Sequence, residues 1–152
     1  AAIGLTLGDR RALARDLPLA ILGAIAVAWL VTRSPSIARQ YPTDPLSRGD
    51  ALRFLLVTIA MAAYGLAWEV FHRGIWLLGF VERLGPRRAL ALHLPIYVVF
   101  HWPAGWVEMA LALPAGVVFG VLALRGKSVI APWLAHVALS TAVNLFAMVG
   151  RN

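Results

Sequence analysis

The sequence predicts an all-α fold: a polytopic membrane helical bundle with about five transmembrane segments, the second of them broken or bent. Hydrophobic residues make up 61% of the 152 residues, against 14% charged residues, and the mean hydropathy is +0.77. This is far too apolar for a soluble domain of this length. Charged and proline-rich stretches divide the chain into apolar runs near the ~20 residues that a helix needs to cross a bilayer. We therefore expect residues 1–152 to form a single transmembrane domain.

The first two helices are expected at 13–31 and from Asp50 onward. Arginines flank the first apolar run, and the connector at 34–49 is too polar to cross a membrane. Asp50 suits the N-cap of the second helix because its short carboxylate can accept a hydrogen bond from a backbone N–H group of the first turn. Gly74 is expected to break or bend this helix. Residues 75–84 should continue it as a shorter segment that leads to the interface.

The rest of the chain predicts three more helices. Gly85-Pro86 stops the second helix, because both residues are poorly suited to a helix interior. Two further turns are expected at Pro103-Ala104-Gly105 and Arg125-Gly126-Lys127. The helices between these breaks are predicted at 89–102, 106–124 and 128–149.

The net charge of +7 comes from basic residues outside or at the rims of the apolar runs. This placement predicts contact with lipid headgroups and argues against nucleic-acid binding, which needs basic residues clustered on one soluble face. More of these residues flank the side of the N-terminus than the other side, which predicts a bacterial inner (cytoplasmic) membrane protein with a cytoplasmic N-terminus. The expected partners are the lipid bilayer and other membrane protein subunits. The chain has no cysteine, which excludes disulfides and a thiol nucleophile.

The most informative stretch is 68–74, Trp-Glu-Val-Phe-His-Arg-Gly, at the end of the second apolar run. Ionisable groups at membrane depth usually face a bundle interior and carry a function. Glu69 and Arg73 are four residues apart, share one helical face and are expected to pair. His101 and His136 lie in other apolar runs at a comparable predicted depth. These groups therefore predict a shared polar cavity.

Three segments together resemble the CPBP family of CAAX prenyl endopeptidases and bacteriocin-processing proteins. Residues 69–74 are similar to the first motif of that family, in which two adjacent glutamates are followed after three residues by an arginine. Residues 97–101 resemble the second motif, an aromatic residue four positions before a histidine. Residues 119–136 resemble the third, a helix and a short basic turn followed by a proline-containing approach to a histidine. The CPBP-like core covers about residues 50–150.

The resemblance implies an intramembrane endopeptidase of the glutamic type that uses no metal or other cofactor. A glutamate and His101 would activate water, and His136 would stabilise the oxyanion together with an Asn or Asp one turn later. Arg73 would hold the glutamate pair, of which Glu69 is present here. A peptide is an expected substrate only if this site is active.

Two departures from the family pattern predict a degenerate site. Trp68 stands where the family has the first glutamate, and Ser140 stands one turn after His136, with Asn144 a further turn along the same face as possible oxyanion support. Glu69 cannot replace the missing carboxylate, because neighbouring helix residues point about 100° apart. Loss of a general base typically lowers the rate by about 10²–10⁴-fold, and loss of an oxyanion donor by about 10²–10³-fold.

Three functions remain open at this point. The favoured one is a non-catalytic subunit or assembly (scaffold) protein of a membrane complex. The alternatives are an active CAAX-type endopeptidase with an altered site and a protein that binds a metal, haem or pigment through histidine. His72 is expected to pack against Trp68. Glu108 and His93 are expected near the membrane interface.

Overall fold

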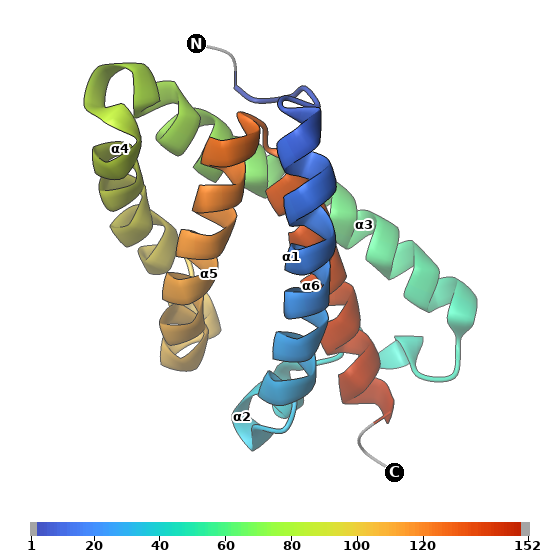
Figure 1. Ribbon diagram of the computed structural model, residues 1–152. Coiled ribbons are helices and arrows are strands. Elements are labelled where there is room, and N and C mark those ends of the chain that lie inside the picture. Colours follow the sequence, from blue (N-terminus) through green and yellow to red (C-terminus); the bar gives the residue numbers. More distant parts are fainter. Residues whose placement is uncertain (1–2, 150–152) are drawn as a thin grey trace.

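The computed structural model describes residues 3–149, and all regular secondary structure in that range is helical, with no strand (Figure 1), which confirms the predicted fold class. Residues 1–2 and 150–152, the ends of the predicted domain, lie outside the described residues. The long helices are α1 (Arg10–Val31), α3 (Ala51–Glu69), α4 (Gly79–Val99), α5 (Trp106–Gly126) and α6 (Ile130–Val149). The short ones are α2 (Pro35–Gln40), η1 (Pro45–Ser47) and η3 (Trp102–Ala104), and η2 (Val70–Leu78) is a π-helical segment that joins α3 to α4.

Four helical stretches of the described chain are long and apolar enough to cross a membrane: Arg10–Val31, Ala51–Ala104, Trp106–Gly126 and Ile130–Val149. The second stretch has 54 residues and would be about 80 Å long if straight, more than twice the thickness of a bilayer core. It reverses direction within α4, where Gly85 has a φ of 74° and Pro86 follows, and Figure 1 shows the chain folding back there. This stretch therefore contains the predicted second and third segments.

The chain reverses at Gly85, and the predicted break at Gly74 is wrong. Gly74 is inside η2, which stays helical but is wider than an α-helix. Gly74 instead allows a close approach by the N-terminal segment: a Cβ atom at this position would lie 2.6 Å from the carbonyl oxygen of Ile3. The glycine thus serves packing between segments.

The N-terminal segment, residues 3–9, is attached to the turn between α5 and α6. The Asp9 N–H group donates to the Gly126 carbonyl (2.8 Å), and the Val129 N–H group donates to the Gly4 carbonyl (2.9 Å). The Asp9 side chain also caps α1, accepting from two backbone N–H groups of the first turn. This end of the bundle therefore holds the N-terminal segment, the α5–α6 turn and the Gly85 reversal together (Figure 1).

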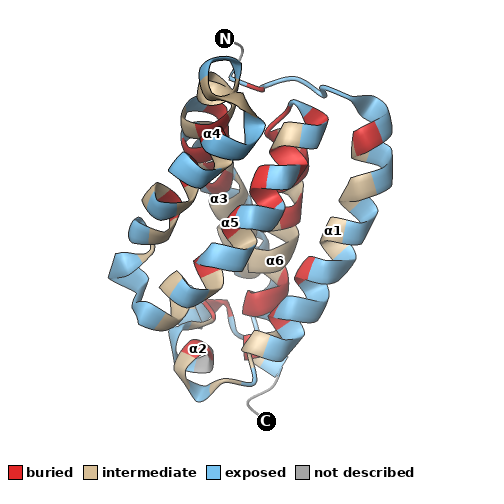
Figure 2. Ribbon diagram, turned by 60° about the vertical axis from the view of Figure 1, so that its left-hand side comes forward, coloured by how far each residue is buried: buried red, intermediate tan, exposed pale blue. Residues whose placement is uncertain are grey.

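Buried positions concentrate on α5 and α6, and α1 is largely exposed (Figure 2). The contact between α1 and α6 uses small side chains, with Ala28 packed against Ala142 and Val143. Small residues let helix backbones approach closely in a membrane, where no hydrophobic effect drives association. Large apolar side chains such as Leu22 and Leu30 point outward and are more than 60% exposed, as expected for a surface that faces lipid. The chain is an integral membrane protein.

The close contact at Gly74 generates a first prediction. Gly74→Ala should lower the free energy of unfolding by roughly 1–3 kcal/mol, because backbone atoms of the N-terminal segment must move. Thermal unfolding in detergent measures this loss, and limited proteolysis should show faster cleavage within residues 3–9. Gly23→Ala is the matched control, since a Cβ atom at Gly23 meets nothing within 4 Å. Equal stability of the two variants would contradict the proposed packing role.

Candidate functional site

The centre of the site is a buried ion pair between α3 and η2. Glu69 and Arg73 are both fully buried, and the Arg73 Nη1 atom donates to Glu69 Oε1 at 3.0 Å. The pairing expected from their four-residue spacing is therefore observed. The Arg73 guanidinium also lies 4.0 Å from the ring centroid of Tyr97, a cation–π contact that strengthens when water is excluded. Arg73 thus joins η2 to α4 as well as to α3.

His136 connects this pair to α6. Its Nδ1 atom lies 2.8 Å from the same oxygen, Glu69 Oε1. An ionised carboxylate can only accept, so Nδ1 carries the proton and donates. The single negative charge of Glu69 is already balanced by Arg73, and a second cation in the membrane interior would be unbalanced and costly. In the neutral form of His136, this hydrogen bond leaves the lone pair on Nε2.

His101 has the same tautomer for a different reason. It lies just after α4, and its Nδ1 atom donates to the Tyr97 carbonyl at 2.8 Å. A carbonyl oxygen accepts and cannot donate, so the proton is on Nδ1 and the lone pair is on Nε2. Neutral His136 and His101 both offer an acceptor, and the oxyanion role implied for His136 would require a donor there.

Trp68 packs on the side of α3 that faces α4. Its ring centroid is 4.4 Å from that of His72, as predicted, and 5.5 Å from that of His101 in an edge-on arrangement. Glu69, one residue later, points to α6, because neighbouring helix residues differ by about 100° in direction. An aromatic ring therefore lies beside His101 at the position where the family motif has its first glutamate.

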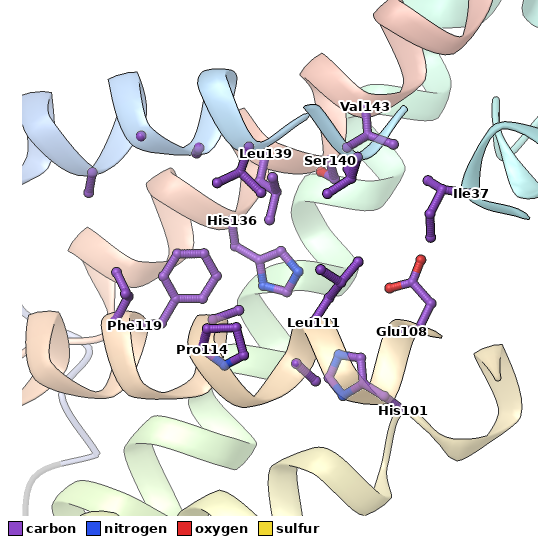
Figure 3. Close-up of a pocket in the computed structure, with 18 of the residues that line it drawn as sticks. Ile37, His101, Glu108, Leu111, Pro114, Phe119, His136, Leu139, Ser140 and Val143 are labelled. Atoms are coloured by element: carbon purple, nitrogen blue, oxygen red, sulfur yellow. The ribbon is translucent and has the colours of Figure 1, made fainter. Parts of the chain in front are cut away.

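Two cavities adjoin the histidines. The larger, about 480 Å³, lies among α1, α2, α5 and α6 and is lined by His101, His136, Ser140 and Glu108 with many apolar residues (Figure 3). The smaller, about 310 Å³, is lined by Trp68 together with both histidines and Ser140. The Trp68 indole is a wall of the smaller cavity and leaves the larger one open.

Ser140 and Asn144 differ in their relation to the cavities. The Ser140 hydroxyl donates to the Val137 carbonyl at 3.2 Å, and the residue lines both cavities. The Asn144 amide group donates to the Ser140 carbonyl and accepts from the Thr43 N–H group, at 2.8 and 2.6 Å. Among the described residues that line the cavities, Ser140 is present and Asn144 is not. Asn144 holds the connector that precedes α3.

His93 and Glu108 are both less exposed than the sequence indicates. His93 is fully buried and stacks on Tyr97, with ring centroids 5.5 Å apart. Glu108 lies in the first turn of α5, half-buried at the larger cavity, where the Tyr41 hydroxyl donates to its Oε1 atom at 3.3 Å, and its place at the membrane interface stays a prediction. Burial first, and the Glu108 carboxyl group second, raise the pKa of Tyr41.

The sequence analysis did not predict that Tyr41 and Tyr97 contact the site, and it did not place Glu108 at the cavity. Tyr41 is in a connector 67 residues away from Glu108 in the chain, so no local pattern joins them. Tyr97 was recognised only as the aromatic residue of a motif. Its spacing of four residues from His101 does carry a signal, because a helix places such residues one above the other.

The described chain contains no group of three or more His, Asp or Glu side chains close enough to hold a metal ion. The histidine-based metal alternative therefore lacks a site with several ligands among residues 3–149.

Comparison with known protein families matches residues 50–142 to the family described as type II CAAX prenyl endopeptidase Rce1-like. The matched region extends from the residue that caps α3 into α6 and includes Glu69, His101 and His136. No curated protein and no solved structure gives a match.

The buried pair generates a second prediction. Glu69→Leu should lower the free energy of unfolding by roughly 3–5 kcal/mol, because it leaves the Arg73 charge buried and uncompensated. The double variant Glu69→Leu/Arg73→Leu should be more stable than either single variant, since it removes both charges. Denaturant unfolding in detergent measures these differences.

The control for this comparison of single and double variants is the surface pair of Arg53 with Asp44, in which the arginine side chain is 45% exposed. Asp44→Asn should change stability by no more than about 1 kcal/mol, because an exposed ion pair is screened by solvent. Additive losses for Glu69→Leu and Arg73→Leu would show that the two residues do not stabilise each other.

Proposed function

The chain belongs to the type II CAAX prenyl endopeptidase Rce1-like family, and on that premise we propose that it is a non-catalytic member. In this proposal it is a subunit or scaffold of a membrane complex. The proposal rests on the contacts of two residues in the first motif. Trp68 lies beside His101, and the Glu69 carboxylate binds Arg73 and His136. Without a carboxylate at the position of Trp68, the family's water-activating pair is incomplete.

The hydrogen bonds of His136 support the same proposal. An oxyanion needs a donor about 2.7–3.1 Å away, and the neutral tautomer bound to Glu69 presents an acceptor at Nε2. The Ser140 hydroxyl hydrogen is used by the Val137 carbonyl. Neither group has a free hydrogen to give to a tetrahedral intermediate. In this proposal, both the activation of water and the stabilisation of the oxyanion are weakened.

A peptide hydrolysis assay tests the proposal. The protein in lipid nanodiscs should release no more product from a farnesylated CAAX peptide than its own His136→Ala variant does. The proposal fails if turnover above that background is seen and is abolished by each of Glu69→Ala, His101→Ala and His136→Ala but kept by Glu82→Ala. Glu82 suits the control because it is exposed and remote from both cavities.

An active endopeptidase with an altered site is the second candidate. The larger cavity favours it, because both histidines line this open space and Glu108 supplies a carboxyl group to the same lining. In this alternative Glu108, from α5, would take over the role of the missing carboxylate. Loss of turnover in Glu108→Gln, with Glu82→Gln active, would identify this second mechanism.

The complex itself is a separate proposal. The membrane helices of this chain would act through contacts with lipids and with other membrane proteins. We expect crosslinking in intact membranes to join it in fixed stoichiometry to another membrane polypeptide. Recovery of the chain only as an uncrosslinked monomer would contradict this part of the proposal.

We also propose a cytoplasmic N-terminus in a bacterial inner membrane. The N-terminal segment lies at the same end of the bundle as the α5–α6 turn and the Gly85 reversal (Figure 1). Flanking basic residues are more numerous at this end, among them Arg87, Arg88 and Lys127. Positive charge near helix ends favours the cytoplasmic side.

A further inference from the structure

The larger cavity has an apolar part and a polar end. Its volume of about 480 Å³ is within the range of ligand sites, about 300–1,000 Å³. Small and aliphatic side chains of α1 and α5, such as Ala20, Gly23 and Val118, line the apolar part. The polar end lies where α5 begins, with Glu108 on its first turn and Tyr41 from the connector. Figure 3 shows Glu108, His101 and His136 around one space.

Four of the polar side chains that line this space donate their hydrogens to other groups of the protein. Tyr41 donates to Glu108, and Ser140 donates to the Val137 carbonyl. His101 and His136 each donate through Nδ1 to a partner that can only accept, Tyr97 carbonyl and Glu69 carboxylate respectively. What they leave toward a ligand is a set of acceptors: two imidazole Nε2 atoms, a hydroxyl oxygen and the Glu108 carboxyl group.

We propose that this cavity binds an amphiphile with an apolar chain and a primary ammonium head. The ammonium carries three N–H donors and a positive charge, and both properties complement the acceptors and the carboxylate. The proposal goes beyond the non-catalytic role and does not depend on it, because binding can be measured whether or not peptides are hydrolysed.

The direction of the bound molecule follows from α5. Glu108 and Phe119 both line the cavity and are eleven residues apart, which is about 16 Å along a helix. The ammonium head would lie between Glu108 and His101, at the end of the bundle near the connector. The apolar chain would extend along Gly23 of α1 toward Phe119.

Amphiphiles with other head groups fit this cavity lining less well. A carboxylate or phosphate head would meet Glu108 and two lone pairs, with no free cation among the described lining residues. A quaternary ammonium has charge but no N–H group, so it leaves the acceptors unsatisfied. A bare metal ion finds no group of three His, Asp or Glu in residues 3–149 close enough to ligate it.

Photoaffinity labelling tests the proposal with the whole chain in phosphatidylcholine nanodiscs. The probe is dodecylamine with a diazirine at the far end of its chain. We expect labels on α1 and α5 residues of the cavity, and at least tenfold less labelling at equal probe concentration in Glu108→Gln. Glu82→Gln is the matched control and should label as the original chain does. The diazirine analogues of dodecyltrimethylammonium and dodecanoate should label the cavity at least tenfold less than the amine.

A second variant keeps the test decisive if Glu108→Gln does not fold. Gly23→Leu should fill the cavity, because a Cβ atom at Gly23 has no neighbour within 4 Å, and it should abolish labelling of α5 without loss of helix. Equal labelling by the three head groups, or labels confined to outward residues such as Leu55 and Ile59 of α3, would overturn the proposal. Unchanged labelling in the filled variant would overturn it as well.

Discussion

The buried Glu69 carboxylate is the constraint on which the rest of the structure depends. A carboxylate without water around it needs partners that supply charge and hydrogen bonds. Arg73 supplies both from the next turn, and His136 supplies a hydrogen bond from α6. Because one oxygen atom accepts from both, α3, η2 and α6 have little freedom to shift relative to one another. Arg73 extends the network to α4 through the face of the Tyr97 ring. A group that resembles part of an active site is thus also the junction of the bundle.

The same junction decides the chemistry of the histidines. Glu69 holds the proton of His136 on Nδ1, and the Tyr97 carbonyl does so for His101. Trp68, one residue before Glu69, turns an aromatic edge toward His101, where hydrolysis would need a base. Proteins of this family are described as endopeptidases, but an endopeptidase site must both remove a proton from water and donate to an oxyanion. In the proposed non-catalytic role, the Nδ1 hydrogens of both histidines are engaged within the protein, so the site would offer acceptors and lack a donor for an oxyanion.

Local patterns predicted much of this arrangement. The cap at Asp50, the pair of Glu69 with Arg73 and the reversal at Gly85-Pro86 depend on residues within a few positions of each other, and all three are present. Gly74 misled the prediction because its lack of a side chain accommodates Ile3, about seventy residues away, rather than a break in the helix. The burial of His93 and the contact of Tyr41 with Glu108 also depend on the packing of distant segments. Hydropathy along the sequence predicts which segments lie within the membrane, but it does not predict which face of a helix packs against another helix.

Glu108 is the clearest case of a residue whose surroundings depend on the packing of distant segments. A carboxyl group in the first turn of a membrane helix is usually explained by the interface, where water solvates it. Here it lies against a cavity that is also lined by two imidazoles and the hydroxyl oxygen of Ser140. Four acceptors facing one space are mutually unfavourable unless something with hydrogens lies between them. A substrate peptide would bring one amide N–H group at a time, whereas an ammonium head brings three donors and a charge to the same point. The proposed lack of free donors, which would weaken hydrolysis, would therefore make the cavity selective for a cationic donor.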